Sequence, residues 1–88
     1  MKIWFKIHKG DKLSAHTVVE CADDLSAREF IEVVRQGCKA MDAPTPAVLN
    51  AHIDKFAKFG IARFYPDDFV EKVDFTRLDC EIMRYRKK

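Results

Sequence analysis

Residues 25–41 place the strongest constraint on the fold, and they read LSAREFIEVVRQGCKAM. Ser26 stands three residues before Glu29, a spacing typical of a capping box, in which each side chain binds the other residue's backbone N–H group. The residues that recur at helical spacing on one side are apolar: Ala27, Phe30, Ile31, Val34, Cys38 and Met41. This segment therefore predicts an amphipathic helix that packs its apolar face on a core.

The length of 88 residues predicts a single domain, 1–88, with little stability to spare. Hydrophobic residues make up 48% of the chain and charged residues 34%, as in soluble globular proteins rather than disordered ones. No stretch has the length of a membrane span or the form of a signal peptide. The three cysteines lack a Cys-x-x-Cys spacing, which favours reduced thiols, so we expect a cytoplasmic protein.

Two segments near the N-terminus predict a β-hairpin. Apolar side chains occupy every second position of residues 3–7, as in a half-buried strand. Gly10 and Asp11 are the expected point of reversal, and residues 16–21 are rich in β-branched side chains. The two strands are expected to pair in antiparallel fashion. Residues 78–82 alternate in the same way and predict a third strand.

A second helix is predicted for residues 47–59. Thr45 suits the N-cap, Pro46 suits the first helical position, and Gly60 stands where a left-handed residue ends a helix. Residues 61–65 follow as a short segment, and both a loop and an extended conformation remain open for it. The order of elements is then ββααβ, which predicts an α+β fold: a small antiparallel three-stranded sheet with two helices on one face.

The residues that commonly bind metals or act as nucleophiles show no catalytic spacing. The histidines and cysteines are widely separated: His8, His16, Cys21, Cys38, His52 and Cys80. Structural zinc ligands come in close pairs, and thiols on the core side of a helix or strand are inert. The carboxylates within residues 67–74 lack the spaced ligands and turn glycine of a calcium-binding loop. We therefore expect no enzyme, no metal and no cofactor.

Aromatic side chains are numerous for a core of this size: seven Phe, one Trp and two Tyr. Those with no obvious place in the core are Trp4, Phe59, Phe64 and Tyr65. At the surface they would mark a contact with a second copy or with another protein; alternatively, the segment after Gly60 folds back and buries them. The leading hypothesis is a non-enzymatic association module, a homodimer or a binder of a protein partner, that uses a sheet edge and these aromatic residues.

Basic residues at the two ends of the chain support nucleic-acid binding as an alternative. The net charge of +2 is small, so these residues would have to cluster in space. They are Lys2, Lys6, Arg84, Arg86, Lys87 and Lys88. Basic side chains would neutralise phosphates, and Tyr85 would stack on a base. No RNA-recognition or helix-turn-helix pattern accompanies them, and a basic tail such as residues 84–88 is more often a frayed, solubilising end.

Short motifs in both halves of the chain carry a family resemblance. They are residues 1–7 (MKIWFKI), 63–65 (RFY), the acidic pair 67–68, 69–71 (FVE), 73–75 (VDF) and Leu78. Together they resemble small uncharacterised single-domain proteins of clostridia-like bacteria, over most of the chain. The resemblance favours a bacterial cytosolic protein that stands alone; it assigns no particular activity, so no functional residue can be carried over. This sequence departs from the pattern in its basic tail, where the resemblance predicts acidic residues.

Overall fold

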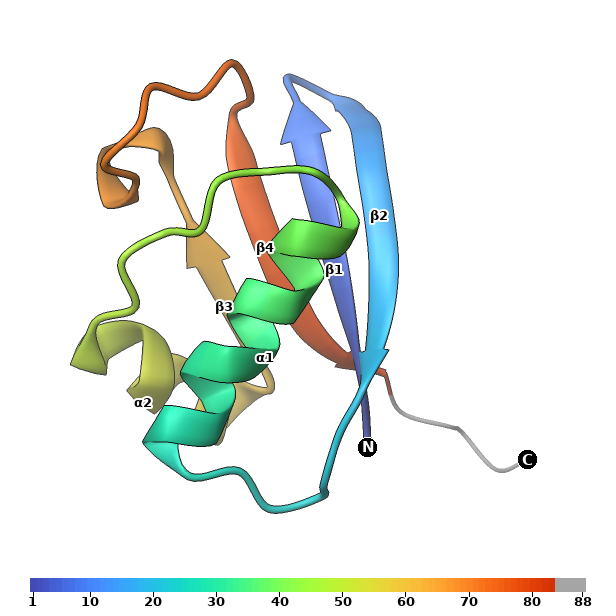
Figure 1. Ribbon diagram of the computed structural model, residues 1–88, viewed down its shortest axis with the longest axis vertical. Helices are drawn as coiled ribbons and strands as arrows, with labels where there is room; N and C mark the ends of the chain where they lie inside the picture. The colour runs from blue at the N-terminus through green and yellow to red at the C-terminus, as the bar shows by residue number, and fades with distance from the viewer. Residues whose placement is uncertain (84–88) are drawn as a thin grey trace.

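Two helices cover one face of a four-stranded antiparallel sheet (Figure 1). The computed structural model describes residues 1–83, so the predicted basic tail of residues 84–88 lies outside the described part. The strands are β1 (Lys2–Lys9), β2 (Lys12–Glu20), β3 (Ile61–Phe64) and β4 (Arg77–Met83), in the spatial order β2-β1-β4-β3. The predicted α+β class and antiparallel sheet are confirmed. The prediction of three strands in the order ββααβ is wrong, because β3 adds a strand.

Strands β1 and β2 form the predicted hairpin. Lys9 pairs with Lys12, so Gly10 and Asp11 make the turn. Gly10 has a φ of 60°, in the left-handed region that glycine adopts without strain. Strand β2 begins at Lys12 rather than at residue 16, because the residues beside the turn continue the ladder with β1.

Helix α1 (Ala27–Ala40) begins at the predicted capping box. The Ser26 hydroxyl accepts a hydrogen bond from the N–H of Glu29 at 3.2 Å, and the Glu29 carboxylate accepts one from the N–H of Ser26 at 2.9 Å. The hydrogen bond from the Ser26 N–H stabilises the charged carboxylate and lowers the pKa of Glu29. The start of this helix is therefore determined by the local sequence.

The buried face of α1 is rotated from the predicted stripe. Ala27 and Ile31 are exposed, and the residues that face the sheet are Phe30, Val33, Val34, Gly37 and Cys38. The sequence pattern assigned no inward role to Gly37 because glycine has no apolar side chain. In the structure, this missing side chain lets α1 lie directly on the sheet.

Helix α2 (Asn50–Phe59) begins later than predicted, so the assignment of Thr45 and Pro46 to its first turn is wrong. The N–H of Ala47 donates to the carbonyl oxygen of Asp68 at 2.8 Å, which holds this part of the chain against the later loop. The helix ends as predicted, at Gly60, whose φ is 73°.

The core lies between the sheet and the two helices. As predicted, apolar side chains of β1 and β4 fill the sheet side: Ile3, Phe5, Ile7, Leu78, Cys80 and, in part, Ile82. On β2 it is Val19 that packs against this core, whereas Val18 is exposed on the opposite face. The ring of Phe30 in α1 meets that of Phe56 in α2, with centroids 4.7 Å apart. The two helices thus share one apolar layer over the sheet.

Strand β3 follows α2 directly after Gly60 and pairs with β4 in antiparallel fashion. Ala62 and Phe64 turn their side chains into the core, whereas the side chain of Arg63 is exposed. A short 3₁₀ turn, η1 (Pro66–Asp68), comes after the strand. β3 is an edge strand, so one of its two sides has no partner strand among residues 1–83.

Candidate protein-binding groove

A groove of about 530 Å³ runs between α2 and the free edge of β3. On the α2 side it is lined by one helical face, Leu49, His52, Lys55 and Phe59, whose spacing of three to four residues brings them into one row. Leu49 is 56% exposed and Phe59 is 70% exposed, so large apolar side chains here remain in contact with water. Contiguous exposed apolar surface rimmed by polar residues is a feature of interaction sites.

The other side of the groove belongs to β3 and the residue after it. The N–H of Ile82 in β4 donates to the carbonyl oxygen of Gly60 at 2.8 Å. In an antiparallel pair, every second residue bonds to the neighbouring strand, so this bond determines which residues of β3 turn their backbone groups toward β4. The backbone N–H and C=O groups of Ile61 and Arg63 therefore point away from β4 and toward the groove. Tyr65, which is 50% exposed, continues this side beyond the strand.

His52 connects the two sides of the groove. Its Nδ1 accepts the N–H of Leu49 at 2.9 Å, so in the neutral ring the proton lies on Nε2. Nε2 lies 3.5 Å from Oδ2 of Asp68, and this same oxygen accepts the N–H of Tyr65 at 2.8 Å. The imidazole also lies against the buried ring of Phe64, with centroids 4.3 Å apart. Three contacts, with Leu49, Asp68 and Phe64, thus hold the His52 side chain between the two sides of the groove.

Two cations lie along the groove. Lys55 is exposed and makes no ion pair within residues 1–83. Arg63 is half-exposed, and its Nε lies 3.6 Å from Oδ1 of Asp79. Among residues 1–83, the only acidic side chain that lines the groove is Asp68, which already accepts the Tyr65 N–H and faces His52. Lys55 is therefore a groove cation without an ion pair among residues 1–83, and it lies next to apolar surface.

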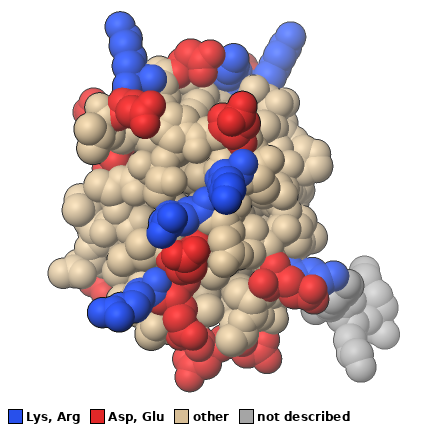
Figure 2. All heavy atoms as spheres, in the orientation of Figure 1, with Lys and Arg blue, Asp and Glu red and all other residues tan. Residues whose placement is uncertain are grey.

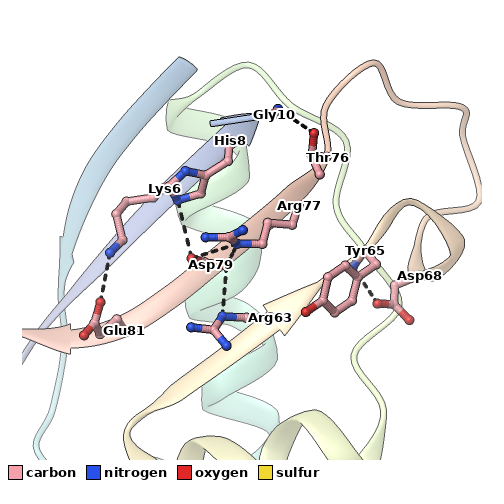
Figure 3. Close-up of polar contacts among 10 residues, drawn as sticks. All are labelled: Lys6, His8, Gly10, Arg63, Tyr65, Asp68, Thr76, Arg77, Asp79 and Glu81. Atoms are coloured by element: carbon pink, nitrogen blue, oxygen red, sulfur yellow. Dashed lines mark hydrogen bonds and ion pairs between the residues drawn. The ribbon is translucent and has the colours of Figure 1, made fainter. Parts of the chain in front are cut away.

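Asp79 lies on the sheet face opposite the helices and is 2% exposed (Figure 3). Arg77 donates from Nε to its two carboxylate oxygens at 3.0 and 3.2 Å. His8 approaches the same carboxylate at 3.4 Å from β1, and Arg63 approaches it from β3. One buried charge thus joins three adjacent strands and holds Arg63 beside the free edge, because a buried carboxylate requires such partners.

The four aromatic residues predicted as a protein contact do not gather in one place. Phe59 and Tyr65 line the groove from its two sides. Phe64 is 0% exposed and belongs to the core, so the prediction that it lies at the surface is wrong; its side chain alternates inward with Ala62. Trp4 lies on the helix-free face of the sheet, where Lys6 Nζ stands 4.4 Å from its ring centroid. The structure therefore keeps two of the four beside the sheet edge.

The residues predicted to bind nucleic acid are described only in part. Lys2 and Lys6 lie on β1 with Trp4, on the helix-free face, and Lys6 pairs with Glu81 of β4 at 2.9 Å. Arg84, Arg86, Lys87 and Lys88 lie outside the described residues. On the face that carries the helices, the acidic and basic side chains of the described residues are interspersed, with no large area of a single sign (Figure 2).

The cysteines and the other titratable clusters of residues 1–83 give no second site. Cys38 and Cys80 are buried, and burial raises the pKa of the Cys38 thiol to about 11 and that of Cys80 further still. Burial also raises the pKa of Cys21. Within these residues, no three His, Cys, Asp or Glu side chains come together as metal ligands, and no helix has the length and apolar character to cross a membrane.

A larger hollow of about 610 Å³ lies at the far end of α1, beside the β1–β2 hairpin. Its apolar residues, such as Met41, Val73 and Phe75, are half-buried or buried, and its charges include the exposed Lys9–Asp74 ion pair at 3.2 Å. This hollow lacks the exposed large apolar side chains that line the β3 groove. We therefore assign the candidate site to the β3 groove.

Sequence reasoning did not identify Leu49, Lys55, Ile61 or Arg63 as members of the site. One signal was available: with an extended segment at residues 61–64, alternation alone separates Ile61 and Arg63 from the inward Ala62 and Phe64. Lys55 and Leu49 had no comparable signal, because their role depends on where α2 packs relative to β3.

A comparison of the chain with protein-family models, curated proteins and solved structures found no match. The resemblance to proteins of clostridia-like bacteria therefore stays a prediction.

Proposed function

We propose that this protein acts by association, and that the β3 groove accepts an extended segment of another polypeptide as an additional strand. A strand added to the edge of β3 forms main-chain hydrogen bonds with the outward N–H and C=O groups of Ile61 and Arg63. Its side chains pack on the exposed apolar residues of α2. The protein on this proposal is a non-enzymatic binding module.

One observation carries the proposal: a free strand edge and exposed large apolar side chains occur side by side. Phe59 and Tyr65 flank Ile61 and Arg63, the two residues whose backbone groups point outward. An unpaired edge alone is a common feature that folded proteins protect by keeping it short. An edge bordered by a groove with apolar lining supplies both the hydrogen bonds and the burial that peptide recognition uses.

The direct test is selection of an unbiased library of displayed heptapeptides on the immobilised full chain, followed by NMR mapping of the selected peptides on the ¹⁵N-labelled protein. The proposal predicts shifts of the Ile61 and Arg63 amides and slower hydrogen exchange at these two positions. Peptides that shift only residues of β1 or of the hollow beyond α1 would overturn it, as would a library that yields no binder.

The matched variants are Phe59→Ala and Ile31→Ala. Both remove an exposed apolar side chain from a helix, but only Phe59 lines the groove. Truncation of a central aromatic contact weakens binding by roughly ten- to thirtyfold. Ile31→Ala is expected to leave the affinity unchanged. Equal effects of the two variants would place the contact elsewhere, and light scattering over a range of concentrations reports whether a second copy is the partner.

Nucleic-acid binding is a second candidate, favoured by the placement of Lys2, Trp4 and Lys6 on the helix-free sheet face. Exposed aromatic rings stack on bases, and lysines beside them neutralise phosphates. Against this reading, Lys6 is already paired with Glu81, and Asp79 places a negative charge at the centre of the same face.

Titration with single-stranded RNA and DNA at low and moderate salt separates the two candidates. Binding that falls steeply with salt and is lost in Trp4→Ala would support the nucleic-acid reading. Shifts confined to the β3 groove, with none on β1, would exclude it.

A further inference from the structure

We propose that the segment bound in the β3 groove alternates apolar and acidic side chains. This proposal rests on the strand-addition function above and names the chemistry of its partner. Three properties of an added strand follow from the groove: its length, the positions of its apolar side chains and its charge.

The length follows from β3 itself. The strand has four residues, and two of them, Ile61 and Arg63, turn their backbone groups toward the groove. Two such residues exchange up to about four main-chain hydrogen bonds with an antiparallel neighbour. An added segment of about five residues is therefore enough to span the free edge, at roughly 3.4 Å per residue.

The apolar positions follow from the alternation of a strand. Side chains of the added segment that turn toward α2 meet Leu49 and Phe59, which are both largely exposed in the free protein. Burial of such side chains against an apolar partner contributes favourably to binding. Every second residue of the segment is therefore apolar.

The charge follows from the residues that border the groove. Side chains on the other face of the added segment lie next to Arg63, which Asp79 holds in place through Nε at 3.6 Å. Lys55 extends over the same groove from α2 and makes no ion pair within residues 1–83. A carboxylate on this face of the added segment lies beside Arg63, and Lys55 adds positive charge to the same groove, whereas a lysine or arginine there is repelled.

The same charges argue against a second copy as the occupant. Two β3 strands that pair edge to edge would bring two Arg63 side chains to one seam, with two Lys55 side chains beside it. Like charges across a seam are unfavourable, and β3 itself supplies no carboxylate to offset them. A partner with acidic residues removes this repulsion.

The experiment uses two capped pentapeptides as probes, Glu-Val-Glu-Val-Glu and Lys-Val-Lys-Val-Lys, each titrated into the ¹⁵N-labelled full chain. The acidic peptide is expected to shift the Ile61 and Arg63 amides and to bind at least about tenfold more tightly than the basic one. An N-methylated acidic peptide, which cannot donate the main-chain hydrogen bonds, is expected to lose this binding.

The matched charge variants are Lys55→Glu and Lys58→Glu. Both reverse an exposed lysine of α2, but Lys58 does not line the groove. Lys55→Glu is expected to weaken the acidic peptide about three- to tenfold and to strengthen the basic one, whereas Lys58→Glu changes either affinity less than about twofold.

The outcomes separate this proposal from the function on which it rests. If both peptides shift the Ile61 and Arg63 amides with equal affinity, the groove accepts strands but the acidic preference is wrong. If neither peptide shifts these amides and the library selection also yields no binder at β3, both proposals are wrong. If light scattering shows a dimer that Lys55→Glu stabilises, a second copy replaces the acidic partner.

Discussion

A β-carbon added to Gly37 would lie 2.6 Å from Cδ1 of Phe5, a distance that real β-carbons do not reach. Helix α1 therefore rests on the ring of Phe5 in β1 at the one point where it has no side chain. Both residues are buried, so neither the helix nor the ring has free space into which to move.

Gly37→Ala is expected to destabilise the protein although alanine favours helices. The gain in helix propensity is about 1 kcal/mol, and overpacking against a fixed ring costs typically 1–3 kcal/mol, so we expect a net loss of up to about 2 kcal/mol. Urea unfolding followed by circular dichroism measures it. The control is Gln36→Ala, an exposed neighbour in the same helix, which is expected to be neutral or slightly stabilising. A stabilised Gly37→Ala variant would contradict the close contact.

Asp79→Asn tests the buried charge that connects β1, β4 and β3. The substitution keeps the shape of the side chain but leaves Arg77 and Arg63 without their carboxylate partner. Because both arginines retain some exposure to water, the expected loss of about 1–3 kcal/mol lies below that of a fully buried pair. Asp74→Asn, at an exposed carboxylate, is the matched control and is expected to change the free energy of unfolding by less than about 0.5 kcal/mol.

Local sequence signals predicted those parts of the fold that local physics determines. The capping box at Ser26, the turn at Gly10 and the end of α2 at Gly60 each depend on residues within a few positions. The predicted start of α2 was wrong because Ala47 takes part in a contact with a distant residue. Its N–H donates to the carbonyl oxygen of Asp68, and Ala47 lies outside the helix. Thr45 followed by proline is the strongest local signal for a helix N-terminus here, but the tertiary contact prevails and the helix begins at Asn50.

The candidate site was predictable only in part for the same reason. The sequence identified Phe59 and Tyr65 as hard to bury, and the structure leaves both exposed. It could not show that Phe64 lies inside, because four residues are too few for a reliable alternation and the partner strand β4 is far along the chain. The groove forms between two elements, and Lys55 lines it only because α2 packs beside β3.

The capping box predicts how stability depends on pH at the start of α1. The hydrogen bonds from Ser26 lower the pKa of the Glu29 carboxyl below its ordinary value of 4.5. The unfolded chain therefore binds more protons than the folded one, and the stabilisation present above this value is lost as the pH falls through the folded pKa. We expect the free energy of unfolding, measured in urea at pH 7 and below pH 4, to change less between the two pH values for Glu29→Gln than for the wild type. Glu32→Gln, on the exposed side of the same helix, should retain the full difference.

His52→Ala tests whether one side chain fixes the geometry of the β3 groove. The variant loses the hydrogen bond from the Leu49 N–H, the contact with Asp68 and the packing on Phe64, and these losses together are expected to cost about 1–3 kcal/mol. Hydrogen exchange at the Leu49 amide should quicken, because its acceptor at the first turn of α2 is gone. His16→Ala, at an exposed position on β2, is the control and should leave both the stability and this amide unchanged. An unchanged Leu49 amide in His52→Ala would show that the imidazole does not hold the two sides together; a quickened one together with weaker peptide binding would identify His52 as the residue that sets the groove's width.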